Sequence, residues 1–254
     1  MAYQRAALGW ERCFLLMPLR NAYNQLLGEE TDRSRPPGID LRGVHILISH
    51  HSWSLKVSVK GIMQTQLTPL RMFFRDTPII PSVRNVDYLD QAIAAHGKMV
   101  YLLTGDLENC EAMIQRILAG GKLPIVNLDL LNGFSRDKYA VNYLKHCGAR
   151  GIISTHLDPL RHAHTIDLYA IQRTFLLDSG AKNTITNQLR NSPVDALEVL
   201  PAPVAPKLLN SVRAISADIP VVGGGLIWTM KEAEELLSQG LDAVSISNPE
   251  MWLN

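Results

Sequence analysis

The sequence has few cysteines, few aromatic residues and no long hydrophobic run, and these shortages exclude several classes of protein. Its 254 residues include three cysteines, an odd and sparse set without metal-ligand spacing, and only 6% aromatic residues. Such a set is typical of a reducing compartment rather than of a disulfide-bonded secreted scaffold, and we expect Cys110 and Cys147 to be buried thiols. The longest apolar run near the start, residues 13–19, is too short to span a bilayer and lacks the layout of a signal peptide. We therefore expect a cytoplasmic protein that does not act at a membrane.

Charge of one dominant sign is also missing. The formal net charge is +1, so no overall basic field indicates nucleic-acid binding. Residues 1–78 hold 10 Lys+Arg and 6 Asp+Glu, a net of +4, whereas residues 79–254 hold 15 and 18, a net of −3. If the second part binds RNA, it must do so through a local basic patch. The candidates for such a patch are Arg136, Lys138, Arg161, Lys182, Arg190 and Lys207.

From residue 79 onward, short segments rich in Ile, Val and Leu alternate with segments of helical periodicity. Short apolar runs of this kind are typical of buried parallel strands. We expect eight strands, at residues 79–84, 99–103, 123–129, 151–155, 169–176, 196–200, 220–223 and 243–247. The fold class is therefore predicted to be α/β, a compact (β/α)₈ TIM-type barrel over residues 72–254. The eighth helix has almost no room before the chain stops.

Helix starts in this region are indicated by capping residues. Asn85, Asp106, Ser135 and Thr229 each precede a helix-like run, and short polar side chains are favoured at that position. Thr229 also has Glu232 three residues later, which is the spacing of a capping box.

Residues 1–71 do not share this alternation and form an N-terminal extension without a recognisable motif. Residues 1–27 could form a helix, residues 29–38 resemble a linker, and residues 45–49 and 55–60 could form strands. Three histidines, His45, His50 and His51, have no supporting cysteine or carboxylate cluster. We therefore expect no metal site.

Glycines and small polar residues follow the last two expected strands. Gly223, Gly224 and Gly225 come after the seventh strand, and Ser247 and Asn248 come after the eighth. In (β/α)₈ barrels these two loops are a common phosphate site, because glycines let the backbone approach the anion and helix N-termini supply N–H donors. The alternative is a tight turn followed by a helix cap. The pattern favours phosphate binding.

Charged and polar residues at the ends of other expected strands could complete a ligand site. The guanidinium groups of Arg84 and Arg173 could bind phosphate, and Asp129, Glu198 and Thr155 could hydrogen-bond to ligand hydroxyls. The alternative is that the arginines and carboxylates form ion pairs inside the barrel. In an enzyme, Asp129 or Glu198 could also serve as an acid or base.

Seven short strings, taken in order, resemble the glycerol-3-phosphate-responsive antiterminator family. They are residues 78–84, 126–133, 151–155, 170–173 with 178–179, 198–201, 224–227 and 247–248. Each string alone is weak, because glycine loops are common in barrels, but the ordered set spans about residues 72–252.

This resemblance implies a barrel that binds glycerol 3-phosphate as its effector and acts on leader mRNA to prevent transcription termination. The regulated genes would serve glycerol uptake and oxidation. We expect a regulator without a cofactor and without catalytic residues, and a homo-oligomer is compatible with the sequence. The alternative is a barrel isomerase or lyase acting on a small sugar phosphate or triose phosphate.

The sequence departs from the family pattern at several positions. Asn127 replaces a usual His, Trp228 a frequent Arg, Ala202 a common Gly, and His156 a frequent Lys or Arg. Two cationic positions near the expected phosphate or RNA surface are thereby lost.

The family also suggests an interpretation of the N-terminus. Its members begin a few residues before the first strand, and residues 72–78 resemble such a start. We expect residues 1–71 to result from an over-long gene prediction; the alternative is a basic arm that contacts RNA.

Overall fold

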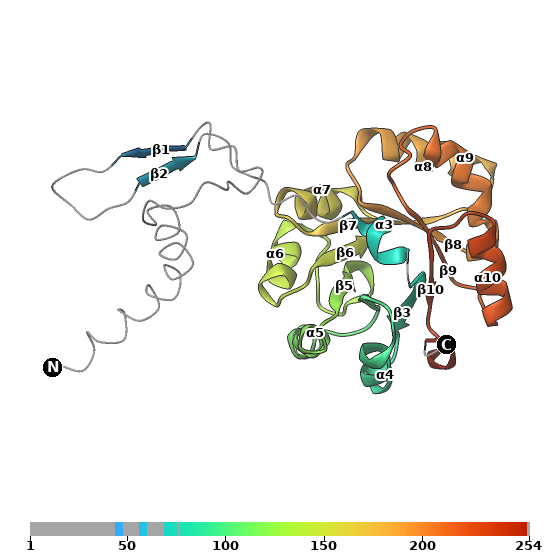
Figure 1. Cartoon of the computed structure of the whole chain (residues 1–254), viewed down its shortest axis with the longest axis horizontal. Coiled ribbons are helices and arrows are strands. Elements are labelled where there is room, and N and C mark those ends of the chain that lie inside the picture. The colour runs from blue at the N-terminus through green and yellow to red at the C-terminus, as the bar shows by residue number, and fades with distance from the viewer. Residues whose placement is uncertain (1–43, 48–55, 60–68, 76, 253–254) are drawn as a thin grey trace, which may run out of the picture. The chain divides into compact units, whose positions relative to one another are not determined.

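The computed structural model describes residues 44–47, 56–59, 69–75 and 77–252 (Figure 1). These residues belong to two compact units, Met1–Ile62 and Met63–Asn254. In the first unit, β1 (Val44–Leu47) pairs antiparallel with β2 (Lys56–Val59). The two strands expected there are thus confirmed. The helix expected over residues 1–27 and the linker over residues 29–38 lie outside the described residues.

The second unit is a closed barrel of eight parallel strands, as the sequence predicts. The strands are β3 (Ile79–Val83), β4 (Met99–Leu102), β5 (Leu123–Asn127), β6 (Gly151–Ser154), β7 (Tyr169–Phe175), β8 (Ala196–Leu200), β9 (Val221–Gly224) and β10 (Ala243–Ile246). The last strand, β10, pairs with the first, β3, with Val244 opposite Ile79. The expected strand over residues 123–129 is too long, because its last two residues, Leu128 and Asp129, enter a 3₁₀ turn instead.

Helices surround the barrel, as Figure 1 shows. They are α4 (Leu89–Ala94), α5 (Cys110–Ala119), α6 (Lys138–His146), α7 (Leu157–Thr165), α8 (Ser179–Asn191), α9 (Leu209–Arg213) and α10 (Met230–Ser238). Four 3₁₀ segments follow strands on the way to the next element: η1 (Val86–Tyr88), η2 (Leu128–Leu130), η3 (Ala202–Leu208) and η4 (Pro249–Met251). Among the described residues, β10 is followed by the short segment η4 and by no α-helix, which agrees with the lack of room expected for an eighth helix. No helix of the described ranges has the length and apolar character that a bilayer crossing requires.

Two of the expected helix starts are confirmed. Thr229 and Glu232 form a full capping box at the start of α10. The Asn85 side chain accepts a hydrogen bond from the Asp87 amide and caps η1. These hydrogen bonds fix the end of the loop after β3 to η1 and the end of the loop after β9 to α10.

The other two expected caps are wrong. At α6, Asp137 replaces Ser135 as the cap, because its carboxylate accepts from two amides, those of Tyr139 and Ala140. At α5, the carboxylate of Asp106 accepts from two amides of the preceding turn, so the helix begins later, after Asn109.

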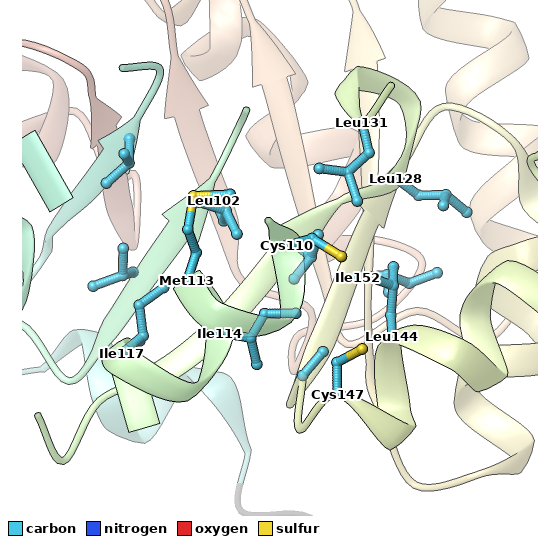
Figure 2. Close-up of a cluster of buried hydrophobic side chains, with 14 of the residues drawn as sticks. Leu102, Cys110, Met113, Ile114, Ile117, Leu128, Leu131, Leu144, Cys147 and Ile152 are labelled. Atoms are coloured by element: carbon cyan, nitrogen blue, oxygen red, sulfur yellow. The ribbon is translucent and has the colours of Figure 1, made fainter. Parts of the chain in front are cut away.

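The hydrophobic core has an outer layer between strands and helices and an inner layer inside the barrel. Figure 2 shows part of the outer layer, where Cys110 and Cys147 are buried among leucines and isoleucines of α5, α6 and the neighbouring strands. Burial raises the pKa of the Cys110 thiol to about 11, so this group stays a thiol. The expectation of buried thiols is confirmed.

A short helix, α3 (Leu70–Phe74), closes the N-terminal end of the barrel and lies within the ring of helices in Figure 1. Leu70 and Phe74 are buried in the inner layer. The Arg71 guanidinium contacts Asp242 at 2.9 Å, just before β10. This closure leaves the C-terminal ends of the strands as the open end of the barrel.

Because α3 begins at Leu70, residues on both sides of Met72 pack against the barrel. A chain that began at Met72 would lack the buried Leu70 side chain and the Arg71 ion pair. The domain boundary between residues 71 and 72 remains a prediction.

Candidate functional site

A cavity of about 400 Å³ opens at the C-terminal end of the barrel. It lies among the ends of β7, β8, β9, β10 and β3, the region where barrels of this class often bind phosphate. Its lining residues are Arg84, Phe175, Leu200, Pro201, Gly225, Leu226, Ile227, Trp228, Ser245, Ile246 and Ser247. Three of the residues predicted from the sequence, Arg84, Gly225 and Ser247, are among them.

The loop after β9 has an unusual backbone. Gly225 has φ of 72° and Leu226 has φ of 57°, so two consecutive residues adopt left-handed conformations. This conformation suits glycine but costs a side chain such as leucine of the order of 1–2 kcal/mol. The Gly225 carbonyl accepts a hydrogen bond from the Ala202 amide at 3.1 Å, which fixes the loop to η3. The strain lies at the wall of the cavity, where strained residues are commonly functional.

The other two glycines of this loop have packing roles in the structure. A Cβ on Gly223 would lie 2.7 Å from Leu241 and 3.1 Å from Ala202, on the outer side of the strand. A Cβ on Gly224 would lie 2.7 Å from the Ser245 hydroxyl and 3.1 Å from the Glu198 carboxylate, inside the barrel. Neither glycine lines the cavity. Gly223 leaves room for Leu241 and for Ala202 of η3, and Gly224 leaves room for the Ser245 and Glu198 side chains of the neighbouring strands β10 and β8.

Arg84 supplies positive charge at the cavity. It follows β3 directly, is exposed, and has no ion pair among the described residues. A guanidinium group in this state is free to bind an anion in a bidentate manner. Ser247, after β10, adds an exposed hydroxyl to the same cavity.

The side chains of Asn248 and Glu232 accept hydrogen bonds from backbone amides that could otherwise donate to an anion. The Asn248 side chain accepts a hydrogen bond from the Glu250 amide and caps η4, which is the alternative expected for it. The Glu232 carboxylate accepts from the amides of Trp228 at 2.7 Å and Thr229 at 3.0 Å. These hydrogen bonds lower the pKa of Glu232.

Arg173 and Glu198 form a buried ion pair inside the barrel, the alternative that the sequence left open. The Arg173 Nε atom lies 2.7 Å from Glu198 Oε2, and the Ser245 hydroxyl donates to Glu198 Oε1 at 2.7 Å. All three side chains are buried. Ser245, which the sequence analysis missed, connects this pair to the cavity because it also lines the cavity wall.

Asp129 and Thr155 are brought together at the ends of β5 and β6, away from the cavity lining. Asp129 accepts hydrogen bonds from the Ser154 hydroxyl at 2.7 Å, the Thr155 amide at 2.6 Å and the Thr155 hydroxyl at 2.8 Å. The Arg136 guanidinium lies 3.9 Å from the same carboxylate. Asp129 therefore fixes the β6 loop to η2.

The apolar part of the cavity wall was not anticipated from the sequence. Phe175, Leu226 and Trp228 line the cavity and remain exposed, Trp228 to 72% of its surface. Their position at the end of β7 and after β9 was the available signal, since residues at the C-terminal ends of barrel strands and just beyond them face the open end. Trp228 was noted only as a departure from the family pattern.

The described residues include no group of three or more His, Cys, Asp or Glu side chains arranged to hold a metal ion. His50 and His51 lie outside the described residues.

Comparisons with known proteins identify the family. The family model described as glycerol-3-phosphate responsive antiterminator matches residues 79–252. The uncharacterized protein YgcP of Escherichia coli (strain K12) is 30% identical over 185 residues, which cover 72% of this chain and 96% of YgcP.

Two solved structures agree. The glycerol uptake operon antiterminator regulatory protein of Listeria monocytogenes str. 4b F2365 matches with a TM-score of 0.66 and 29% identity, over 70% of this chain and 96% of that one. A glycerol uptake operon antiterminator-related protein of Thermotoga maritima MSB8 matches with a TM-score of 0.62 and 31% identity, over 68% and 96%. The family match covers the whole barrel, including both loops of the cavity. The chain therefore belongs to the glycerol-3-phosphate responsive antiterminator family.

Proposed function

We propose that this protein is a transcription antiterminator that binds glycerol 3-phosphate in the cavity and acts on leader mRNA of glycerol uptake and catabolism genes. The observation that carries the proposal is the position of Arg84, which has no ion pair within the described part of the chain, beside the strained Gly225 loop and Ser247, in a chain of this family. A phosphate group requires a cation, backbone that allows close approach, and hydroxyl donors. The cavity offers all three.

The proposed regulation follows from linkage between two ligands. If glycerol 3-phosphate orders the loops after β9 and β10, and RNA binds the ordered state more tightly, each ligand raises the affinity for the other by the same factor. Three of the basic residues named above, Lys138, Lys182 and Lys207, are exposed on α6, α8 and η3 and are candidates for RNA contact.

The first experiment is calorimetric titration of the full chain with sn-glycerol 3-phosphate, with glycerol and inorganic phosphate as comparison ligands. Arg84→Gln should weaken binding of glycerol 3-phosphate about tenfold, because a charge-assisted contact with phosphate is lost. Arg150→Gln is the matched control, since Arg150 is exposed at the opposite end of the barrel, just before β6. Absence of binding by the unaltered protein would refute the proposed effector.

The RNA part of the proposal needs its own measurement. Affinity for a leader RNA should rise when glycerol 3-phosphate is saturating, and should fall steeply with salt because Lys and Arg contacts release counterions. Equal RNA affinity with and without the effector would contradict the linkage.

The alternative, an isomerase or lyase, has weaker support. The carboxylates that could act as a base, Asp129 and Glu198, already accept short hydrogen bonds or pair with an arginine. A general base must reach the proton of a bound substrate. We expect no turnover of triose phosphates followed by NMR, and any protein-dependent conversion would favour the enzyme instead.

A further inference from the structure

Buried polar side chains lie inside the barrel next to the cavity. Glu198 accepts hydrogen bonds from Arg173 Nε and from the Ser245 hydroxyl, each at 2.7 Å. Because Ser245 also lines the cavity, one side chain separates the cavity from this interior group. The Glu198 carboxylate is therefore one hydrogen bond away from a residue of the cavity wall.

Tyr101 also lies inside the barrel, and its hydroxyl has no hydrogen-bond partner among the residues that the structure describes. It lies on β4, is fully buried in the inner layer of the core, and its hydroxyl makes no hydrogen bond. Burial raises the pKa of Tyr101 well above its ordinary value; the Glu198 carboxylate adds to the rise and Arg173 opposes it. The phenol is thus a neutral O–H donor close to the ion pair.

Asn127 supplies a second unpartnered donor. Its Oδ1 atom accepts from the Asp129 amide at 3.0 Å, which fixes the orientation of the amide, while its Nδ2 atom is buried and makes no hydrogen bond. Ile125, two residues earlier on β5, belongs to the inner layer. Side chains two residues apart on a strand share a face, so Asn127 faces the barrel interior. It lies two residues closer than Ile125 to the C-terminal end of β5.

Two buried donors without partners on the adjacent strands β4 and β5 require an explanation. Proteins pair nearly all buried polar groups, because an unmet donor loses its hydrogen bonds to water without replacement. In the described residues only four buried side-chain nitrogen or oxygen atoms lack a partner, and these are two of them. A ligand that accepts hydrogen bonds would satisfy both.

The chemistry of the donors indicates which part of a ligand they would meet. Both are neutral, and the charges of Arg173 and Glu198, which lie near Tyr101, offset each other. They suit the oxygen of a hydroxyl group better than a phosphate dianion, whose counter-charge, Arg84, lies at the cavity wall. A molecule with phosphate at one end and hydroxyls at the other would match this arrangement.

We infer that Tyr101 and Asn127 bind the hydroxyl groups of the effector and so select a polyol phosphate over other phosphates. The inference rests on the proposed binding of glycerol 3-phosphate in this cavity. Both donor atoms are buried in this structure, so binding requires a rearrangement of the side chains between them and the cavity.

The test compares glycerol 3-phosphate with 1-propyl phosphate, which has the same carbon chain and phosphate but no hydroxyls. Both are titrated calorimetrically into the full chain and into Tyr101→Phe. Loss of one hydrogen bond should weaken glycerol 3-phosphate binding by about three- to tenfold and leave propyl phosphate binding unchanged. Asn127→Ser, which keeps an oxygen for the Asp129 amide but removes the Nδ2 donor, should give the same selective loss.

Two controls separate binding from folding. Tyr169→Phe removes a phenol hydroxyl from the far end of the same interior and should leave both affinities unchanged. Because the Tyr101 hydroxyl has no partner in the free protein, Tyr101→Phe should not lower the thermal midpoint.

Equal weakening of both ligands, or no weakening of either, would overturn the hydroxyl role while the proposed function stands. No binding of glycerol 3-phosphate to the unaltered protein would overturn the proposed function, and this inference with it.

Discussion

The two ends of the barrel differ in how their residues are used. At the N-terminal end, α3 buries Leu70 and Phe74, and Arg71 is held by Asp242 and by the carbonyl of Ala217. At the C-terminal end, apolar side chains at the end of β7 and after β9 stay exposed around a cavity. The first end is closed by buried side chains, whereas the second keeps apolar surface exposed around the cavity in which we propose that the effector binds. Barrels commonly separate stability and function in this way.

The exposed apolar residues make the contrast sharper. The structure describes eleven large hydrophobic side chains that are exposed, and eight of them lie at the last residue of a strand or just beyond it, at the open end. These eight are Val86, Tyr88, Leu107, Leu130, Phe175, Leu177, Leu226 and Trp228. Burying such groups in the free protein would stabilise it, so their exposure is consistent with a surface kept for binding.

The largest expected effect on stability comes from truncating a buried side chain of α3, the helix that closes the N-terminal end of the barrel. Phe74→Ala should lower the free energy of unfolding by about 3–5 kcal/mol, because a buried aromatic side chain leaves a cavity in the inner layer. Met72→Ala on the same helix is the control, since Met72 is half exposed and should cost far less. Denaturant unfolding measures both. Similar losses for the two variants would mean that α3 does not seal the barrel.

A smaller effect is expected from relieving backbone strain at each end. Leu226→Gly, at the open end, and Asp167→Gly, between α7 and β7, each remove a side chain from a left-handed conformation. We expect Leu226→Gly to stabilise the fold by about 1 kcal/mol, and Asp167→Gly by less, because Asp tolerates this conformation better. Only Leu226→Gly should weaken effector binding. Equal binding by both variants would show that the strained loop plays no part in the site.

The smallest expected effect is a difference between the two ends in how a carboxyl group makes folding stability depend on pH. Glu232 at the open end has a lowered pKa in the folded protein, so its contribution to stability is complete above its ordinary value of 4.5 and is lost as pH falls through the lowered pKa. Asp195, just before β8, has a raised pKa because of burial, so its contribution is complete below 3.8 and is lost as pH rises through the raised value.

Unfolding midpoints measured between about pH 6 and 3 test these signs. Relative to the unaltered protein, Glu232→Gln should reduce the loss of stability on acidification, whereas Asp195→Asn should increase it. Curves of the same shape for both variants would contradict the assignment of opposite shifts to the two ends.

Most of the fold could be predicted from the sequence because barrel strands are short, apolar and regularly spaced. All eight were located, and the capping box at Thr229 and Glu232 marked α10 correctly. The errors occurred where two candidates compete locally. At Ser135 and Asp137, the second residue binds two amides and determines the helix start, and spacing alone does not rank them.

The candidate site was only partly predictable. Arg84, Gly225 and Ser247 could be found because their position just beyond a strand places them at the mouth. The pairing of Arg173 with Glu198, and the unpartnered state of Tyr101 and Asn127, depend on which face of a strand meets the barrel axis and on contacts between distant strands. A sequence pattern contains the residues but not these contacts.

The pairing of β10 with β3 has a consequence for how the protein is made. Val244 must meet Ile79, so the ring closes through partners far apart in the chain, and such distant contacts slow folding. On the ribosome, the earlier strands are synthesised first but wait with an open seam until β10 emerges. The buried Trp252, whose indole donates to the Ile246 carbonyl at 2.8 Å, lies just after that last strand. In a variant whose other three tryptophans are replaced by phenylalanine, the fluorescence of Trp252 should therefore report when the newly made ring becomes complete.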